Sequence, residues 1–141
     1  MKTIQKRLRL SEKIVKEIES LAAGSGEDFS RLVRDLLVEA LKMRRCPGII
    51  FADGRTGRRA RIVGTGIDVW EFIAQFRALG EDYEKLKESY HWLSEQQLRS
   101  GLAYYALYPE DINTRISAND ALTENVVYQK FPFLRLKGTR K

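Results

Sequence analysis

The 141-residue sequence contains very little cysteine or histidine. Cys46 is its single cysteine, so no disulfide can form within one chain, and His91 is its single histidine. This composition argues strongly against a zinc site built from cysteine and histidine side chains. We therefore expect no metal and no cofactor.

The sequence also lacks long apolar runs, a recognisable signal peptide and a catalytic pattern. No apolar run is long enough to cross a bilayer, so we expect a cytoplasmic protein with no membrane partner. The carboxylates fall on predicted helix faces, where exposure to water explains them, and no nucleophile is paired with a base. We therefore expect a protein that is not an enzyme.

The charges are distributed unevenly, although the net charge is +6. Residues 1–45 carry 11 basic and 7 acidic side chains, and residues 46–66 carry 4 and 1. Residues 67–120 carry 5 basic and 10 acidic side chains, whereas residues 121–141 carry 5 and 1. Because basic segments attract phosphate, we expect the first two segments to face nucleic acid and the acidic middle segment to lie away from it.

The N-terminal residues 3–10 alternate between polar and apolar side chains, with Lys6 as the exception. In an extended chain, alternate side chains share one face, so this segment predicts a β-strand with one polar and one apolar face. The polar set contains Thr3, Gln5, Arg7 and Arg9, and the apolar set contains Ile4, Leu8 and Leu10.

Two amphipathic helices are predicted after this strand. Ser11 is a suitable N-cap for the first, which residues 24–26 should end, and Asp28 can cap the second. A unit of about 45 residues buries little surface alone, and its strand has no partner nearby, so we predict a dimer with antiparallel strands and a shared helical core. The predicted dimer core contains Ile4, Leu8, Leu10, Ile18, Leu32 and Leu36.

This strand and helix pair, over residues 2–45, resembles the ribbon-helix-helix DNA-binding repressors. The resemblance implies a double-stranded DNA operator whose bases are contacted by Gln5, Arg7 and Arg9. Arginine can donate two hydrogen bonds to guanine, and glutamine can pair with adenine. The alternative is an ordinary amphipathic edge strand with solvated arginines.

The family commonly holds a DNA phosphate at the N-terminus of the second helix, where free backbone N–H groups favour an anion. Glu27 and Asp28 occupy that turn and would compete with a phosphate. We therefore expect this phosphate contact to be weak, to be shifted to nearby residues of the same turn, or to be replaced by basic residues elsewhere in the chain. The candidates for DNA-backbone contact are Thr3, Ser25, Gly26, Ser30, Arg58 and Arg59. For the two arginines, a solvated hairpin tip is the favoured alternative.

A short hairpin and four helices are predicted beyond Pro47 and Gly48. Residues 49–51 and 60–63 should form the two strands of the hairpin. Helices should follow from Asp68, from about residue 81 to 88, from Ser94 to Tyr108, and from Pro109 onward. Trp70, Trp92, Tyr104 and Tyr105 are expected in the core, with interface anchors as the alternative.

Residues 61–70, 90–95 and 102–105 resemble the bacterial domain-of-unknown-function family 433, often described as VapB-type antitoxin. The resemblance covers about residues 49–115 and implies a small helical fold similar to helix-turn-helix domains. The helix from Ser94 to Tyr108 contains Arg99 as its only basic residue, so we expect it to contact protein rather than DNA.

The C-terminal residues 121–141 are too apolar for a solvated coil. In antitoxins, the family expectation is a C-terminal region that folds onto a toxin, here a PIN-like ribonuclease. The predicted toxin-binding residues are Phe131, Phe133, Arg135 and Lys137. One of the two basic residues could block a carboxylate-rich nuclease site. The alternative is a strand that packs against the chain's own middle domain or its dimer mate.

Taken together, these patterns predict a mainly α-helical protein with three parts. Residues 1–45 form the ribbon-helix-helix unit, residues 49–120 form the hairpin and the helical antitoxin-like domain, and residues 121–141 form the tail. The expected function is a DNA-binding antitoxin of a type II toxin–antitoxin pair that represses its own operon. The alternative is a stand-alone transcriptional regulator whose C-terminal domain serves assembly or effector sensing.

Overall fold

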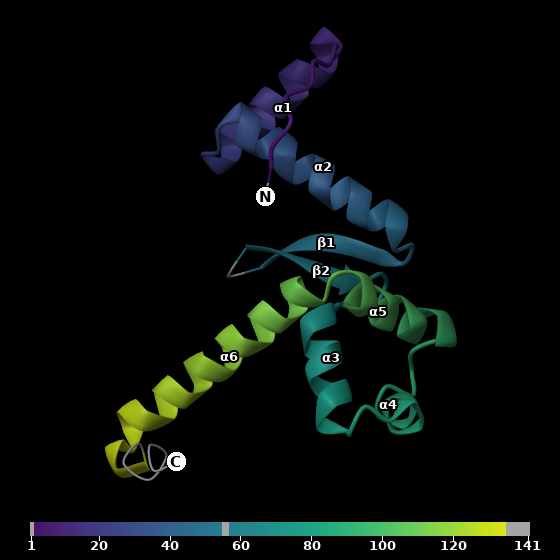
Figure 1. Ribbon diagram of the computed structural model, residues 1–141, viewed down its shortest axis with the longest axis vertical. Helices are drawn as coiled ribbons and strands as arrows, with labels where there is room; N and C mark the ends of the chain where they lie inside the picture. Colours follow the sequence, from purple (N-terminus) through teal and green to yellow (C-terminus); the bar gives the residue numbers. More distant parts are fainter. Residues whose placement is uncertain (1, 55–56, 135–141) are drawn as a thin grey trace. The chain divides into compact units, whose positions relative to one another are not determined.

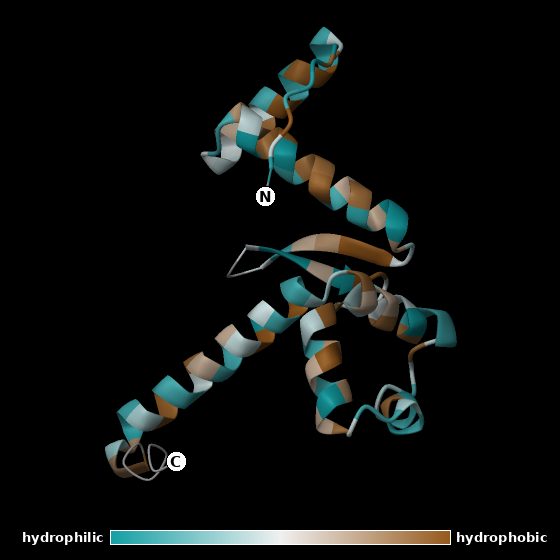
Figure 2. Ribbon diagram, in the orientation of Figure 1, coloured by the Kyte–Doolittle hydropathy of each residue, from teal (hydrophilic) through white to brown (hydrophobic). Residues whose placement is uncertain are grey.

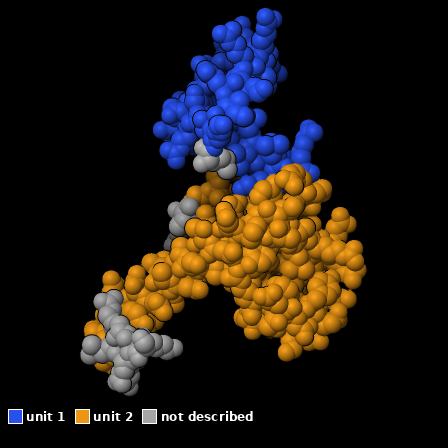
Figure 3. Space-filling model, viewed as in Figure 1, with its two compact units in different colours: residues 1–44 blue, residues 45–141 orange. Residues whose placement is uncertain are grey.

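A computed structural model describes residues 2–54 and 57–134 of the chain. It is mainly helical, with one small antiparallel sheet (Figure 1). Two compact units, Met1–Arg44 and Arg45–Lys141, are distinguished in Figure 3 and are called unit 1 and unit 2. The elements are α1 (Glu12–Ser25), α2 (Phe29–Arg45), β1 (Ile49–Gly54), β2 (Gly57–Ile62), β3 (Ile67–Asp68), α3 (Val69–Ala78), α4 (Tyr83–Ser89), α5 (Glu95–Leu107) and α6 (Pro109–Lys130).

Both helices of unit 1 begin and end as the sequence predicts. The hydroxyl of Ser11 accepts a hydrogen bond from the backbone N–H of Ile14 at 3.3 Å, and α1 ends at Gly26, which has a φ of +74°. Asp28 Oδ1 accepts a hydrogen bond from the backbone N–H of Arg31 at 2.7 Å. The local capping chemistry therefore sets both helix starts.

The predicted strand over residues 3–10 is absent from the single chain, where residues 2–11 form neither helix nor strand. A strand requires a neighbour for its backbone hydrogen bonds, and the other elements of unit 1 in the described residues are the helices α1 and α2. Pairing with a second copy stays a prediction.

The predicted hairpin is confirmed. β1 and β2 pair antiparallel, with Ile49 opposite Ile62 and Gly54 opposite Gly57. The sheet also contains a third strand, β3, which the sequence does not predict, and the strand order is β1-β2-β3. β3 has only two residues, and Asp68 lies opposite Arg61 in its register. The turn into β3 uses glycines, since Gly64 and Gly66 have φ values of +77° and +71°.

Helices α3, α4 and α5 complete the core of unit 2. The predicted capping boxes at the starts of α3 and α5 are both present, and α4 begins two residues later than expected. Gly101 of α5 lies so near α3 that a Cβ atom there would be 2.6 Å from the ring of Phe72. The largest fully buried side chains are Tyr104, Phe72, Ile62, Ile73, Leu86, Leu98 and Val69.

Helix α6 starts in this core and continues well beyond it (Figure 1). Ile112 and Ile116 are buried, whereas residues 117–127 are all exposed. The helix runs without interruption across residues 120 and 121. Within the tail 121–141, residues 121–130 continue the helix that Pro109 begins, so the alternative of a strand does not hold for these residues.

Candidate functional site

The residues predicted to contact DNA bases lie on the extended N-terminal segment. Gln5, Arg7 and Arg9 are all exposed. Ile4 and Leu8, from the apolar set of the same segment, are exposed too, at 77% and 71%. In the single chain, neither face of the segment is covered.

Unit 1 has almost no core of its own. Among its described residues, Ala22 and Leu32 alone are buried. Of the other predicted dimer-core residues, Ile18 is half-buried and Leu36 is 37% exposed. Apolar bands recur along α1 and α2 in Figure 2. The exposed large apolar side chains of unit 1 are Ile4, Leu8, Leu10, Ile14, Leu21, Leu36, Leu37, Val38, Leu41 and Met43.

The residues proposed for DNA-backbone contact differ in how they are engaged. Thr3, Gly26 and Ser30 are exposed. Ser25 Oγ lies within hydrogen-bonding distance of two carbonyls of its own helix, at 3.2 and 3.3 Å. Arg58 forms an ion pair with Asp53 at 3.2 Å on the hairpin surface. These contacts to DNA stay predictions.

Arg59 has a role inside unit 2. Its Nε lies 2.9 Å from Oδ2 of Asp68, while Nε–H of Arg61 donates to Oδ1 of the same carboxylate at 3.0 Å. The side chain of Asp68 is only 4% exposed. Two guanidinium groups therefore compensate one buried carboxylate at the start of α3.

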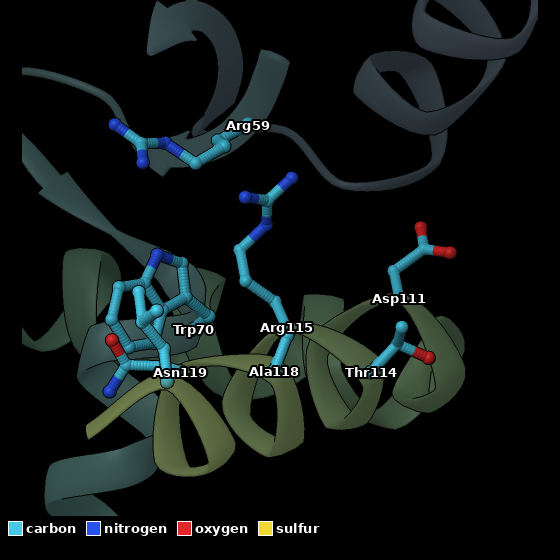
Figure 4. A pocket seen from close by; sticks show the side chains of 8 residues that line it. Arg59, Trp70, Asp111, Thr114, Arg115, Ala118 and Asn119 are labelled. Carbon is cyan, nitrogen blue, oxygen red and sulfur yellow. The ribbon is translucent and has the colours of Figure 1, made fainter. Parts of the chain in front are cut away.

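Arg59 also lines a pocket of about 440 Å³ in unit 2 (Figure 4). Figure 4 shows Arg59 on the β2 side, with Trp70 of α3 and the side chains of α6 around the opening. Arg115 extends from α6 toward the space in front of Arg59. The lining residues are Arg59, Trp70, Asp111, Thr114, Arg115, Ala118, Asn119 and Leu122.

Two buried polar groups lie in or beside this pocket, the phenol of Tyr104 and the indole N–H of Trp70. The phenol of Tyr104 donates a hydrogen bond to Asp111 Oδ2 at 3.1 Å. Burial, together with the nearby carboxylate of Asp111, raises the pKa of Tyr104. The indole Nε1 of Trp70 is buried and has no hydrogen-bond partner among the described residues.

The sequence alone does not predict this pocket. Its residues are separated by as many as 63 positions along the chain, and no motif connects them. From the sequence, Trp70 is predicted only as an aromatic residue of the core or of an interface. The four aromatic residues expected in the core differ in their exposure. Tyr104 is buried, Trp70 and Tyr105 are half-buried, and Trp92 is 61% exposed.

The predicted toxin-binding residues lie at and beyond the end of α6. Phe131 and Phe133 are exposed, and their ring centroids are 6.1 Å apart in an edge-to-face arrangement. Arg135 and Lys137 lie outside the described residues.

A family model described as "Protein of unknown function (DUF433)" matches residues 49–105. The match includes the sheet, α3, α4 and most of α5, but neither α1 and α2 nor α6. No similar curated protein and no similar solved structure was found. None of the helices in the described ranges combines the length and apolar character that crossing a membrane requires.

Proposed function

We propose that this protein is a dimeric DNA-binding antitoxin that represses its own operon and neutralises a PIN-like ribonuclease toxin. The observation that carries the proposal is the exposed apolar surface of unit 1. The resemblance of that unit to ribbon-helix-helix repressors supplies the expected architecture.

A second copy explains why unit 1 leaves so many apolar side chains exposed. Leu21, Leu37 and Leu41 are each more than half exposed in the single chain. Burying one such side chain contributes roughly 1.5 to 3 kcal/mol, so covering several of them offsets the cost of association. Apolar patches of this kind mark interaction sites on small domains.

The extended segment 2–11 would complete the same dimer. Two such segments paired antiparallel would satisfy each other's backbone groups, which a lone chain leaves to water. The alternation of the segment would then put Ile4 and Leu8 on the helices and Gln5, Arg7 and Arg9 on the outer face. A two-stranded ribbon of this kind fits the major groove, where arginine and glutamine discriminate between bases.

The exposed half of α6 supports a protein partner. Beyond the core, this helix and the residues after it expose Leu122, Val126, Phe131 and Phe133. Exposed apolar side chains on a helix and on the residues after it can bind a groove on another protein. In the proposed complex, the apolar residues anchor the tail, and the basic residues that follow reach toward the acidic nuclease site.

The DNA-binding part is tested with the triple substitution of Gln5, Arg7 and Arg9 to alanine. Binding to a site selected from random duplexes should lose its preference for that site and retain weak binding that falls steeply with salt. Arg99→Gln, on α5 of unit 2, removes one exposed charge as the control and should retain the preference. Unchanged site preference in the triple variant would refute base contact.

The antitoxin part is tested by mass spectrometry of proteins that co-purify with the native protein. A small acidic nuclease should be recovered, and Phe131→Ala combined with Phe133→Ala should abolish its recovery. Alanine at both Arg135 and Lys137 should then release nuclease activity in a reconstituted pair. Recovery of no nuclease from the native source, or inhibition that both pairs of substitutions leave unchanged, argues against this part.

A second candidate function is a DNA-binding regulator that has no toxin partner. The observation that favours it is the pocket of unit 2, which offers a place for an effector. Both candidate functions use unit 1 as a dimeric DNA-binding unit. They differ only in what unit 2, including α6, recognises.

A further inference from the structure

We propose that the pocket of unit 2 binds a small organic anion, with a carboxylate or phosphate group carried on an apolar or aromatic body. The site lies wholly within unit 2, between β2, α3 and α6. It does not depend on the proposed DNA binding or on the proposed toxin.

The size of the pocket suits a small molecule. Its volume of about 440 Å³ falls within the range of roughly 300 to 1,000 Å³ that small-molecule sites occupy. Such sites combine mostly apolar walls with a few polar groups that fix the orientation of the ligand. Here, Trp70, Ala118 and Leu122 supply the apolar part.

The polar groups favour an anion because several of them are donors. Arg59 and Arg115 bring two guanidinium groups to the lining, each with five N–H donors, so both can hold a ligand while they keep other contacts. Figure 4 shows the Arg115 side chain extended into the space between α6 and β2. Guanidinium groups bind carboxylate and phosphate through paired, charge-assisted hydrogen bonds.

The single carboxylate in the lining does not reverse this preference. Asp111 Oδ2 accepts the phenol hydrogen of Tyr104. With Asp68 and Arg61 beside Arg59 included, three guanidinium groups face two carboxylates around the site. One positive charge is left over, so an oxyanion is favoured over a cationic ligand.

Trp70 adds a donor that lacks an acceptor among the described residues. Its Nε1–H is buried, and a buried donor without an acceptor carries a free-energy cost. A ligand oxygen that reaches this N–H through a small movement of the covering side chains would remove that cost. The indole ring would then stack against the body of the ligand, which explains the preference for an apolar or aromatic group.

Arg59 is held in place before any ligand arrives. Its Nε lies beside the buried carboxylate of Asp68. A Cβ atom on Gly54 would be only 2.3 Å from Cζ of Arg59, so the absence of a side chain at Gly54 gives the guanidinium its place. A positioned charge loses less conformational freedom on binding than a mobile one, and this favours affinity.

The test uses the full-length Trp92→Phe variant, in which Trp70 is the only tryptophan. Trp92 is exposed on the turn before α5 and does not line the pocket. Benzoate and phenyl phosphate are titrated as probes, with inorganic phosphate, benzylamine and benzyl alcohol for comparison. We expect saturable changes in Trp70 fluorescence, and a shift of the Trp70 indole N–H resonance, with at least one of the two aromatic anions.

The matched variants are Arg115→Gln and Arg99→Gln in the same background. Arg115→Gln should weaken binding of the aromatic anion by roughly tenfold, the loss expected for one charge-assisted contact. Arg99→Gln, which removes an exposed charge of α5 outside this pocket, should bind as the background does. Thermal melting of both variants is measured to establish that they are folded.

Three results would overturn the proposal. The first is no saturable change with either aromatic anion, and the second is equal binding of benzyl alcohol or benzylamine. The third is unchanged affinity in folded Arg115→Gln. If inorganic phosphate binds as tightly as phenyl phosphate, the assignment of an apolar body to the ligand is wrong.

Discussion

The carboxylate of Asp68 lies 2.9 Å from the guanidinium Nε of Arg59, nine positions earlier in the chain. Arg61, directly opposite Asp68 in the β2–β3 register, donates to the other carboxylate oxygen. Asp68 also precedes α3, and its backbone N–H donates a hydrogen bond to Glu71 Oε1 at 3.4 Å. One buried side chain thus connects the hairpin to the helix that positions Trp70.

Asp68→Asn tests this connection, since asparagine keeps the shape and a good N-cap but removes the charge. We expect the free energy of unfolding to fall by about 2 kcal/mol, below the roughly 3 to 5 kcal/mol for breaking a fully buried pair, because both guanidinium groups partly reach water. Urea unfolding measures the change.

The exposed ion pair of the same hairpin provides the control for Asp68. Asp53 is 89% exposed beside Arg58, so Asp53→Asn should cost less than about 1 kcal/mol. Equal losses in the two variants would show that the buried pair has no special role.

Gly101 permits the close approach of α5 to α3, so Gly101→Ala should destabilise unit 2. The added Cβ would be 2.6 Å from the Phe72 ring and 3.0 Å from Ile62 Cδ1, and relieving such overpacking typically costs about 1 to 3 kcal/mol. Gly24 in α1 has nothing within 4 Å of a Cβ, so Gly24→Ala should raise helix stability by up to about 1 kcal/mol. Melting temperatures that move in the same direction would contradict this prediction.

The raised pKa of Tyr104 predicts that the folded protein loses stability in alkaline solution. Burial and the Asp111 carboxylate raise the pKa of its phenol above the ordinary value of 10.0. As pH rises above that value, the unfolded chain releases the phenol proton first, so the stabilising contribution is present at lower pH and is lost at higher pH. Melting temperatures between pH 8 and 11 should therefore fall less steeply in Tyr104→Phe than in the native protein. Parallel curves for the two proteins would contradict the expectation.

Leu36→Glu tests whether a second copy covers α2. In the proposed dimer, a carboxylate at this position would be buried without a partner, so the dimer should dissociate. Sedimentation equilibrium should then give the mass of one chain for this variant and of two chains for the native protein. Leu107→Glu, at an exposed leucine of α5 in unit 2, should retain the native mass. A Leu36→Glu variant that also retains it would exclude this dimer core.

Local chemistry made much of the fold predictable. Ser11, Asp28 and Ser94 cap helices where the sequence places them, because capping depends on a few neighbouring residues. The hairpin is likewise determined by short strands around a turn. β3 was not predictable, since two residues carry no periodicity and their pairing depends on Arg61 and Asp68.

Features that depend on distant residues or on other chains were harder to predict. The pocket requires β2, α3 and α6 to be packed together, and pairwise sequence spacing holds no information about that packing. Val126, Val127 and Tyr128 have side chains that favour strands, but here they continue a helix, and the sheet found in the described residues contains only β1, β2 and β3. In the N-terminal segment, by contrast, a strand is predicted and the single chain has none. The predicted strand would need a second copy of the chain as its pairing partner.

The continuity of α6 has a consequence for turnover of the free protein. Residues 117–127 of this helix are exposed, so we expect these turns to unwind and rewind more readily than the turns that contain Ile112 and Ile116. A protease that engages the unwound end would pull on a helix whose first turns belong to the core of unit 2. We therefore expect cleavage and unfolding of the free chain to be coupled, so that a partner bound over residues 117–127 would lengthen the lifetime of unit 2.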